Sequence, residues 1–133
     1  MSAKLILLLH ESEDDSIEEI ISVCLNYMAG WNVVSIPFTY EGINRLLSKQ
    51  PDAILLDVLL CEMPGLSIRQ RRLIKKLKSY PLTQASPILL VTDKASWFTP
   101  EQLQALGITG AIEKPFDPVT LPAQIAKILH WSE

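Results

Sequence analysis

The strongest constraint on the fold is an apolar run that ends in a carboxylate. Ala53-Ile54-Leu55-Leu56 follows Pro51-Asp52 and leads directly into Asp57. An apolar run of this length, without polar alternation, is typical of a parallel strand that is covered on both faces. Burying a carboxylate is costly, but it is tolerated at the carboxyl end of such a strand, where doubly wound folds place their ligands. The run therefore predicts a parallel α/β sheet and makes Asp57 the first candidate site residue.

Strand patterns alternate with helix patterns along the rest of the chain. Strands are expected over residues 4–9, 32–36, 53–57, 88–91 and 111–113. Apolar stripes from Ile17 to Leu25 and from Leu121 to Leu129 indicate a first and a last helix. Two further helices are expected over 41–48 and 67–78. Another is expected to begin after the N-cap Thr99 and to end at Gly107. This alternation predicts a flavodoxin-like, doubly wound, five-stranded parallel sheet in the order 2-1-3-4-5, with helices on both faces.

Composition sets the broad class. A chain of 133 residues with 48% apolar and 20% charged residues fits one globular domain, so residues 1–133 are interpreted as one domain without an output domain. The net charge of −3 disfavours general nucleic-acid binding. The apolar run at 5–9 is too short for a signal peptide or a membrane span, and Cys24 and Cys61 are interpreted as reduced thiols. The expected location is the cytoplasm, without membrane contact.

Two more polar side chains follow expected strands. Thr92 comes directly after the 88–91 run, and Lys114-Pro115 comes directly after the 111–113 run. Because the carboxyl ends of parallel strands meet at one edge of a sheet, Thr92, Lys114 and Asp57 are expected on the same rim. Alone, each has an ordinary interpretation: a capping acid, a strand-end hydroxyl and a solvated lysine. Together they suit a phosphorylated aspartate.

In this order the motifs resemble the receiver domain of response regulators, of the chemotaxis-receiver type, over essentially the whole chain. The motifs are 51–57 ending in Asp57, Gly65 eight residues later, Val91-Thr92, and the tetrapeptide from Glu113 to Phe116. The resemblance implies that Asp57 accepts the phosphoryl group and that Thr92 hydrogen-bonds it. It also implies that Lys114 pairs with its oxygens and that Pro115 follows a cis bond.

The resemblance further implies a Mg²⁺ ion held by Asp57, the carbonyl of Leu59 and acids after the first strand. The family usually has two acidic residues there, and this chain has His10 and Glu11. Neutral imidazole is a poor ligand for Mg²⁺, so Glu11 is the expected ligand and weak binding is predicted. This choice assumes that the first strand ends at Leu9. A later helix start would instead bring Glu13 or Asp14 toward the ion.

Two further departures bear on signalling. Ala111 stands where the family usually has an aromatic switch residue, and Cys61 stands where it commonly has proline. The basic residues of 69–78 are interpreted as a solvated helix face, with a specific acidic partner as the alternative. His10 is interpreted as a partly exposed loop residue.

The leading hypothesis is a two-component receiver that is phosphorylated on Asp57 by a sensor histidine kinase or a phosphotransfer protein and signals to a downstream protein in trans. Its expected chemistry is limited to Mg²⁺-dependent self-phosphorylation and autodephosphorylation of Asp57. The alternative is a pseudo-receiver, a protein-binding module that works without phosphorylation. The oligomeric state stays open, a homodimer included.

Overall fold

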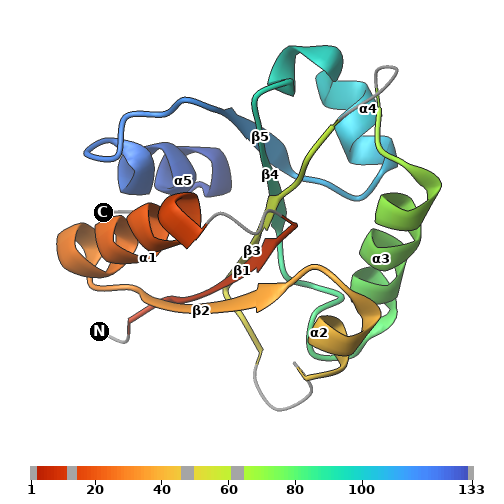
Figure 1. Ribbon diagram of the computed structural model, residues 1–133, viewed down its shortest axis with the longest axis horizontal. Helices are drawn as coiled ribbons and strands as arrows, with labels where there is room; N and C mark the ends of the chain where they lie inside the picture. Colours follow the sequence, from red (N-terminus) through yellow and green to blue (C-terminus); the bar gives the residue numbers. More distant parts are fainter. Residues whose placement is uncertain (1–2, 12–14, 46–49, 61–64, 132–133) are drawn as a thin grey trace.

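The five strands form one parallel sheet in the order β2-β1-β3-β4-β5, which confirms the predicted fold. The computed structural model describes residues 3–11, 15–45, 50–60 and 65–131. The strands are β1 (Leu5–His10), β2 (Asn32–Pro37), β3 (Ala53–Asp57), β4 (Ile88–Thr92) and β5 (Gly110–Glu113). Since β1 and β3 are neighbours, their carboxyl ends lie side by side at one edge of the sheet (Figure 1).

Helices cover both faces of the sheet (Figure 1). One face carries α1 (Asp15–Ala29) and α5 (Leu121–Leu129), and the other carries α2 (Tyr40–Asn44), α3 (Ile68–Ser79) and α4 (Pro100–Ala105). A short 3-10 turn, η1 (Ala95–Trp97), follows β4. Within the described residues, no helix is long and apolar enough to cross a membrane.

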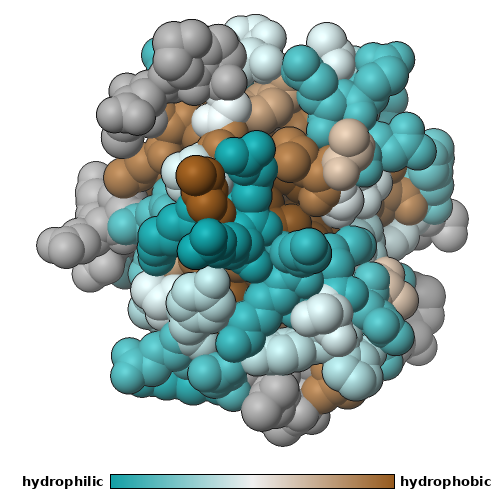
Figure 2. Space-filling model, turned by 90° about the vertical axis from the view of Figure 1, so that its right-hand side faces the viewer, coloured by the Kyte–Doolittle hydropathy of each residue, from teal (hydrophilic) through white to brown (hydrophobic). Residues whose placement is uncertain are grey.

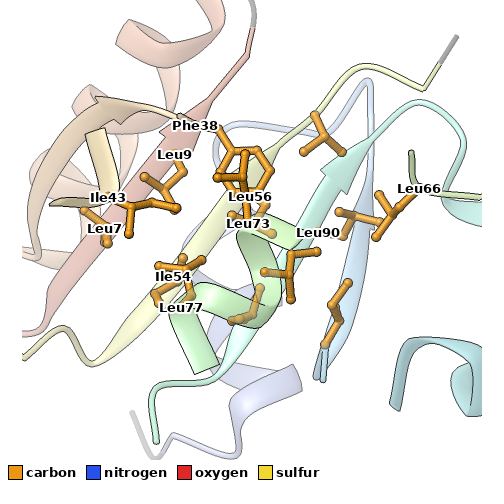
Figure 3. Close-up of a cluster of buried hydrophobic side chains, with 14 of the residues drawn as sticks. Leu7, Leu9, Phe38, Ile43, Ile54, Leu56, Leu66, Leu73, Leu77 and Leu90 are labelled. Atoms are coloured by element: carbon orange, nitrogen blue, oxygen red, sulfur yellow. The ribbon is translucent and has the colours of Figure 1, made fainter. Parts of the chain in front are cut away.

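Alternating strand residues point to opposite faces of the sheet and belong to two separate hydrophobic cores. Leu7 and Leu9 of β1 point to the α3 face, and Ile6 and Leu8 point to the α1 and α5 face. On the α3 face, Leu73 and Leu77 pack over the strand residues Ile54, Leu56 and Leu90 (Figure 3). Both faces are therefore apolar, which explains the near-continuous apolar runs in the sequence.

Several element boundaries differ from the predicted ones. β1 runs to His10 rather than ending at Leu9, because His10 is still in register with Pro37 and Asp57 on its two neighbouring strands. The described part of α2 ends at Asn44, and residues 46–48 of the predicted helix 41–48 lie outside the described residues. The turn η1 has no counterpart among the predicted elements.

The predicted start of α4 is confirmed in detail. Thr99 is the N-cap, its Oγ1 accepts a hydrogen bond from Gln102 N at 3.1 Å, and Gln102 Oε1 accepts one from Thr99 N at 2.9 Å. Pro100 occupies the first turn, where its missing N–H costs nothing. The helix ends at Ala105, and Gly107 follows with a φ of +81° that favours glycine.

Candidate functional site

The strand register brings the three predicted rim residues to the same edge. Asp57 is the last residue of β3 and pairs with Val91 of β4. Thr92 is the next residue of β4 and pairs with Glu113, the residue before Lys114. The sheet therefore delivers a carboxylate, a hydroxyl and an ammonium from three adjacent strands, as the sequence predicts.

Asp57 and Lys114 form a buried ion pair. The distance from Lys114 Nζ to Asp57 Oδ1 is 2.6 Å, and the side chains are only 18% and 3% exposed, in that order. An ammonium at this distance neutralises a carboxylate that burial would otherwise penalise. The Lys114-Pro115 bond is cis, as the resemblance implies. The pair therefore places the Lys114 amino group beside the candidate nucleophile.

Thr92 is fully buried, and its hydroxyl organises the turn after β4. Its Oγ1 accepts a hydrogen bond from the backbone N–H of Lys94 at 3.1 Å. The next residues form η1, whose Trp97 packs, with Phe98, against the same apolar core as Ala111. The turn after Thr92 and the small Ala111 side chain therefore belong to one packed region at the end of β4 and β5.

Glu11 lies beside Asp57, although the reason given from the sequence is wrong. β1 extends through His10, and Glu11 follows it directly, with its backbone N–H donating to the Asp57 carbonyl at 3.0 Å. Its carboxylate accepts a hydrogen bond from the backbone N–H of Leu59 at 2.8 Å. Glu11, Asp57 and Leu59 therefore lie together, as predicted. The alternatives Glu13 and Asp14 lie outside the described residues.

Two residues of α3 reach this site, and sequence reasoning missed both. Gln70 Nε2 donates to Glu11 Oε1 at 2.9 Å and to the Leu59 carbonyl at 3.0 Å. Arg69 Nη1 lies 3.0 Å from Glu11 Oε2, and its Nη2 donates to the Phe38 carbonyl at 2.8 Å. Arg69 therefore has an acidic partner within the chain itself. The available signal was the spacing of Ser67 and Gln70, which forms a capping box and turns Gln70 toward the loop.

His10 is not a loop residue. It is the last residue of β1, and its Nε2 lies 3.3 Å from Glu18 Oε1 on α1. Glu18 also accepts a hydrogen bond from the Ser35 hydroxyl. His10 is thus turned toward α1, while Glu11, the following residue, is turned toward α3. The two positions that the resemblance assigns to acidic residues therefore serve different sides of the sheet.

The donor set fits a hard divalent cation. Asp57, Glu11 and Leu59 offer two carboxylates and a carbonyl, and Mg²⁺ prefers such oxygen ligands and retains several waters. A carboxylate has about four lone-pair positions. Three protein donors already use some of them on Glu11.

Among the described residues, no group of three or more His, Cys, Asp or Glu side chains could hold a metal ion. The chemistry therefore fits Mg²⁺ with few charged ligands and with competition from α3.

Cys24 belongs to the core, away from this rim. It is buried with α1 residues against α5, and its thiol donates to the carbonyl of Pro118. Burial raises the pKa of the Cys24 thiol, and the nearby charge of Asp117 raises it further. A thiol with a raised pKa is a poor nucleophile, so Cys24 is a structural residue.

Known proteins share both the sequence pattern and the fold. The model of the family described as "Response regulator receiver domain" matches residues 11–126. The phosphate regulon transcriptional regulatory protein PhoB of Pseudomonas aeruginosa is 31% identical over 130 residues, which cover 98% of this chain and 53% of that protein. The alkaline phosphatase synthesis transcriptional regulatory protein PhoP of Bacillus subtilis is 30% identical over 119 residues, covering 87% of this chain and 47% of that protein. The chain thus spans about half the length of these relatives.

Solved structures of other proteins have the same fold as this chain. The chemotaxis response regulator CheY4 of Vibrio cholerae superposes with a TM-score of 0.73 at 25% identity, covering 96% of this chain and 99% of that one. The receiver domain of the sensor histidine kinase PA1611 from Pseudomonas aeruginosa has a TM-score of 0.67 at 21% identity, covers 97% and 99% of the two chains, and holds a magnesium ion in its active-site cleft. With the family match, the sheet order and the Asp57, Thr92 and Lys114 rim in agreement, this chain belongs to the response regulator receiver domain family, the receivers of two-component signalling.

Proposed function

We propose that Asp57 accepts a phosphoryl group from a sensor histidine kinase or a phosphotransfer protein. The observation that carries this proposal is the buried Asp57 carboxylate held 2.6 Å from Lys114 at the carboxyl edge of the sheet. Thr92, on the neighbouring strand, adds a hydroxyl to the same rim. Doubly wound sheets bind ligands at this edge, which supports a phosphoryl site there.

The transfer is a nucleophilic substitution at phosphorus. One Asp57 oxygen forms a bond to phosphorus while the bond from phosphorus to the donor nitrogen breaks, and the donor imidazole keeps that electron pair. Before the transfer, the Lys114 ammonium neutralises the Asp57 carboxylate. After the transfer, it pairs with the phosphoryl oxygens and neutralises their charge instead. The Thr92 hydroxyl donates a hydrogen bond to the same group. A Mg²⁺ ion held by Asp57, Glu11 and the Leu59 carbonyl would neutralise further phosphoryl charge.

Phosphorylation is proposed to alter the α4, β5 and α5 face and thereby its affinity for a downstream protein. Small acyl phosphates serve as donors in the absence of a kinase, and water removes the group again. With Ala111 on β5, no bulky aromatic ring changes position, so the two states differ by few contacts and the response is modest.

The test is the intact mass of the protein after incubation with Mg²⁺ and a small acyl phosphate. The expected result is the gain of one phosphoryl group, lost again on treatment with hydroxylamine, which cleaves acyl phosphates. A protein that gains no mass with an acyl phosphate or with any phosphorylated histidine donor would contradict the proposal. In that case the protein-binding module that works without phosphorylation becomes the better interpretation.

Glu11→Gln is expected to weaken Mg²⁺ binding several-fold. The substitution keeps the shape of the side chain but removes one of two carboxylates from the proposed ligand set, and Mg²⁺ favours charged oxygen. Isothermal titration calorimetry measures the affinity. Glu19→Gln, on the exposed side of α1, has the same change in charge and should bind as the parent does. Unchanged affinity in Glu11→Gln would remove Glu11 from the ligand set and direct attention to Glu13 and Asp14.

His10→Asp is expected to tighten Mg²⁺ binding. His10 is in register with Asp57 on the adjacent strand, so a carboxylate there adds a charged oxygen next to the site. The same calorimetric titration applies, and His10→Asn is the control of equal size without the charge. If His10→Asp binds no better than His10→Asn, position 10 is too far turned toward α1 to contribute a ligand.

A further inference from the structure

The first turn of α3 is tied to the proposed cation ligands by one buried side chain. Gln70 is 4% exposed, and all of its polar atoms are engaged. Its Oε1 accepts from the backbone N–H of Ser67 at 2.8 Å, and its Nε2 donates to Glu11 Oε1 at 2.9 Å and to the Leu59 carbonyl at 3.0 Å. The carboxamide therefore links the N-cap of α3 to two of the three proposed ligands.

Arg69 adds a charge to the same contact. Its guanidinium reaches Glu11 Oε2 with one nitrogen at 3.0 Å and the Phe38 carbonyl with another at 2.8 Å. It therefore joins α3, the segment after β1 and the segment after β2. Hydrogen bonds to a charged acceptor are stronger than neutral ones, and a guanidinium is always protonated. Glu11 thus has a cationic partner supplied by the protein itself.

The face that contains α3 is largely hydrophilic at its centre, as the space-filling view from the right-hand side of Figure 1 shows (Figure 2). Arg69 has a half-exposed side chain, whereas Gln70 on the same helix is buried. The ion pair between Arg69 and Glu11 is therefore exposed to water, whereas the Gln70 bonds are partly buried. Gln70 is the stronger obstacle to any ligand that approaches Glu11 and Leu59.

We propose that Arg69 and Gln70 form a clamp, called the α3 clamp below, that competes with a divalent cation for Glu11 and the Leu59 carbonyl. This inference rests on the cation site of the proposed function and adds a regulator to it. Donated hydrogens already use three of the about four lone-pair positions on Glu11, so a cation that binds both carboxylate oxygens, or the side that faces α3, displaces at least one of them. Cation binding and the docking of the first turn of α3 therefore oppose each other, and each weakens the other by the same factor.

The sharpest test is Gln70→Glu. The substitution retains an oxygen that accepts from Ser67 N, so the cap of α3 is kept, and it replaces the donating amide by a carboxylate oxygen. That oxygen then lies where Nε2 is now, 2.9 Å from Glu11 Oε1 and 3.0 Å from the Leu59 carbonyl. Mg²⁺ affinity is expected to rise by at least about tenfold, because a competing donor becomes a charged ligand. The melting temperature should fall in chelator and recover in Mg²⁺.

Arg69→Met is a second variant that does not disturb a buried residue. It keeps the aliphatic stem and removes the guanidinium, so Mg²⁺ affinity should rise several-fold. Arg72→Met is the matched control: Arg72 is exposed on the same helix, and the change in net charge is identical. An increase in Arg69→Met well beyond that in Arg72→Met assigns the effect to the clamp rather than to the field of the whole protein.

A structural readout separates the clamp from the affinity itself. In the parent, the side-chain amide signals of Gln70 in a ¹⁵N correlation spectrum should shift as Mg²⁺ saturates the site. If Gln70→Glu binds Mg²⁺ no more tightly than the parent and Arg69→Met no more tightly than Arg72→Met, or if the Gln70 amide signals stay unchanged at saturation, the clamp is refuted. Phosphorylation of Asp57 by an acyl phosphate is measured independently, so loss of the clamp and loss of the proposed function give different results.

Discussion

Asp57→Asn should abolish the uptake of phosphate from any donor. The side-chain amide has the shape of the carboxylate but is no nucleophile toward phosphorus. The asparagine side-chain oxygen can still accept a hydrogen bond from Lys114, in place of the carboxylate oxygen that now lies 2.6 Å from Nζ. The fold should therefore persist. Intact mass spectrometry after exposure to Mg²⁺ and an acyl phosphate gives the result directly, and circular dichroism checks the fold.

Asp52→Asn provides the matched control. Asp52 lies just before the amino end of β3, where its Oδ2 accepts a hydrogen bond from Leu5 N at 2.7 Å, and an asparagine oxygen can do the same. This variant should gain one phosphoryl group, as the parent does. Phosphate retained by Asp57→Asn would show that a different residue is modified.

Lys114→Met should destabilise the protein by about 3–5 kcal/mol, the usual cost of removing one partner from a buried ion pair. Methionine fills much of the same volume, so the main effect is a buried Asp57 carboxylate without its cation. Urea unfolding followed by circular dichroism measures the change. A loss below about 1 kcal/mol would mean that water already screens the pair, as it does for surface ion pairs.

The double variant Asp57→Asn with Lys114→Met isolates the electrostatic part of this cost. With both charges gone, no unpaired charge is left in the rim, so most of the lost stability should return. The difference between the single and double variants is the coupling of the two residues. If the double variant is as unstable as Lys114→Met alone, the lysine acts through packing and not through its charge.

The sequence predicts the rim well because the relevant information is local. Asp57 and Thr92 each follow an apolar run, Lys114 follows the short strand β5, and parallel topology then brings the ends of these strands to one edge. Only the presence and order of the strands is needed for this inference. Errors of one residue in the limits of β4 or β5 do not change it.

The surroundings of Glu11 were beyond sequence reasoning because they depend on contacts between distant segments. Arg69 and Gln70 are 58 and 59 residues from Glu11 along the chain. On a helix with six basic residues, nothing in the local pattern marks Arg69 as the one that reaches a carboxylate. The carboxyl end of β1 also depends on contacts between distant segments. His10 stays in the strand because it pairs with β2 and β3, although its own hydropathy indicates a loop.

The hydrogen bond from Lys94 N to Thr92 Oγ1 bears on how far the turn after β4 must rearrange to recognise a phosphoryl group on Asp57. A hydroxyl has two lone pairs and one proton, so it can accept from Lys94 and donate to a phosphoryl oxygen at the same time. The proposed hydrogen bond to a phosphoryl group would therefore not require the loss of the bond from Lys94 N that holds the turn into η1. If Asp57 is phosphorylated as proposed, its recognition by Thr92 would cost little conformational entropy, because the turn after β4 is already held by this hydrogen bond.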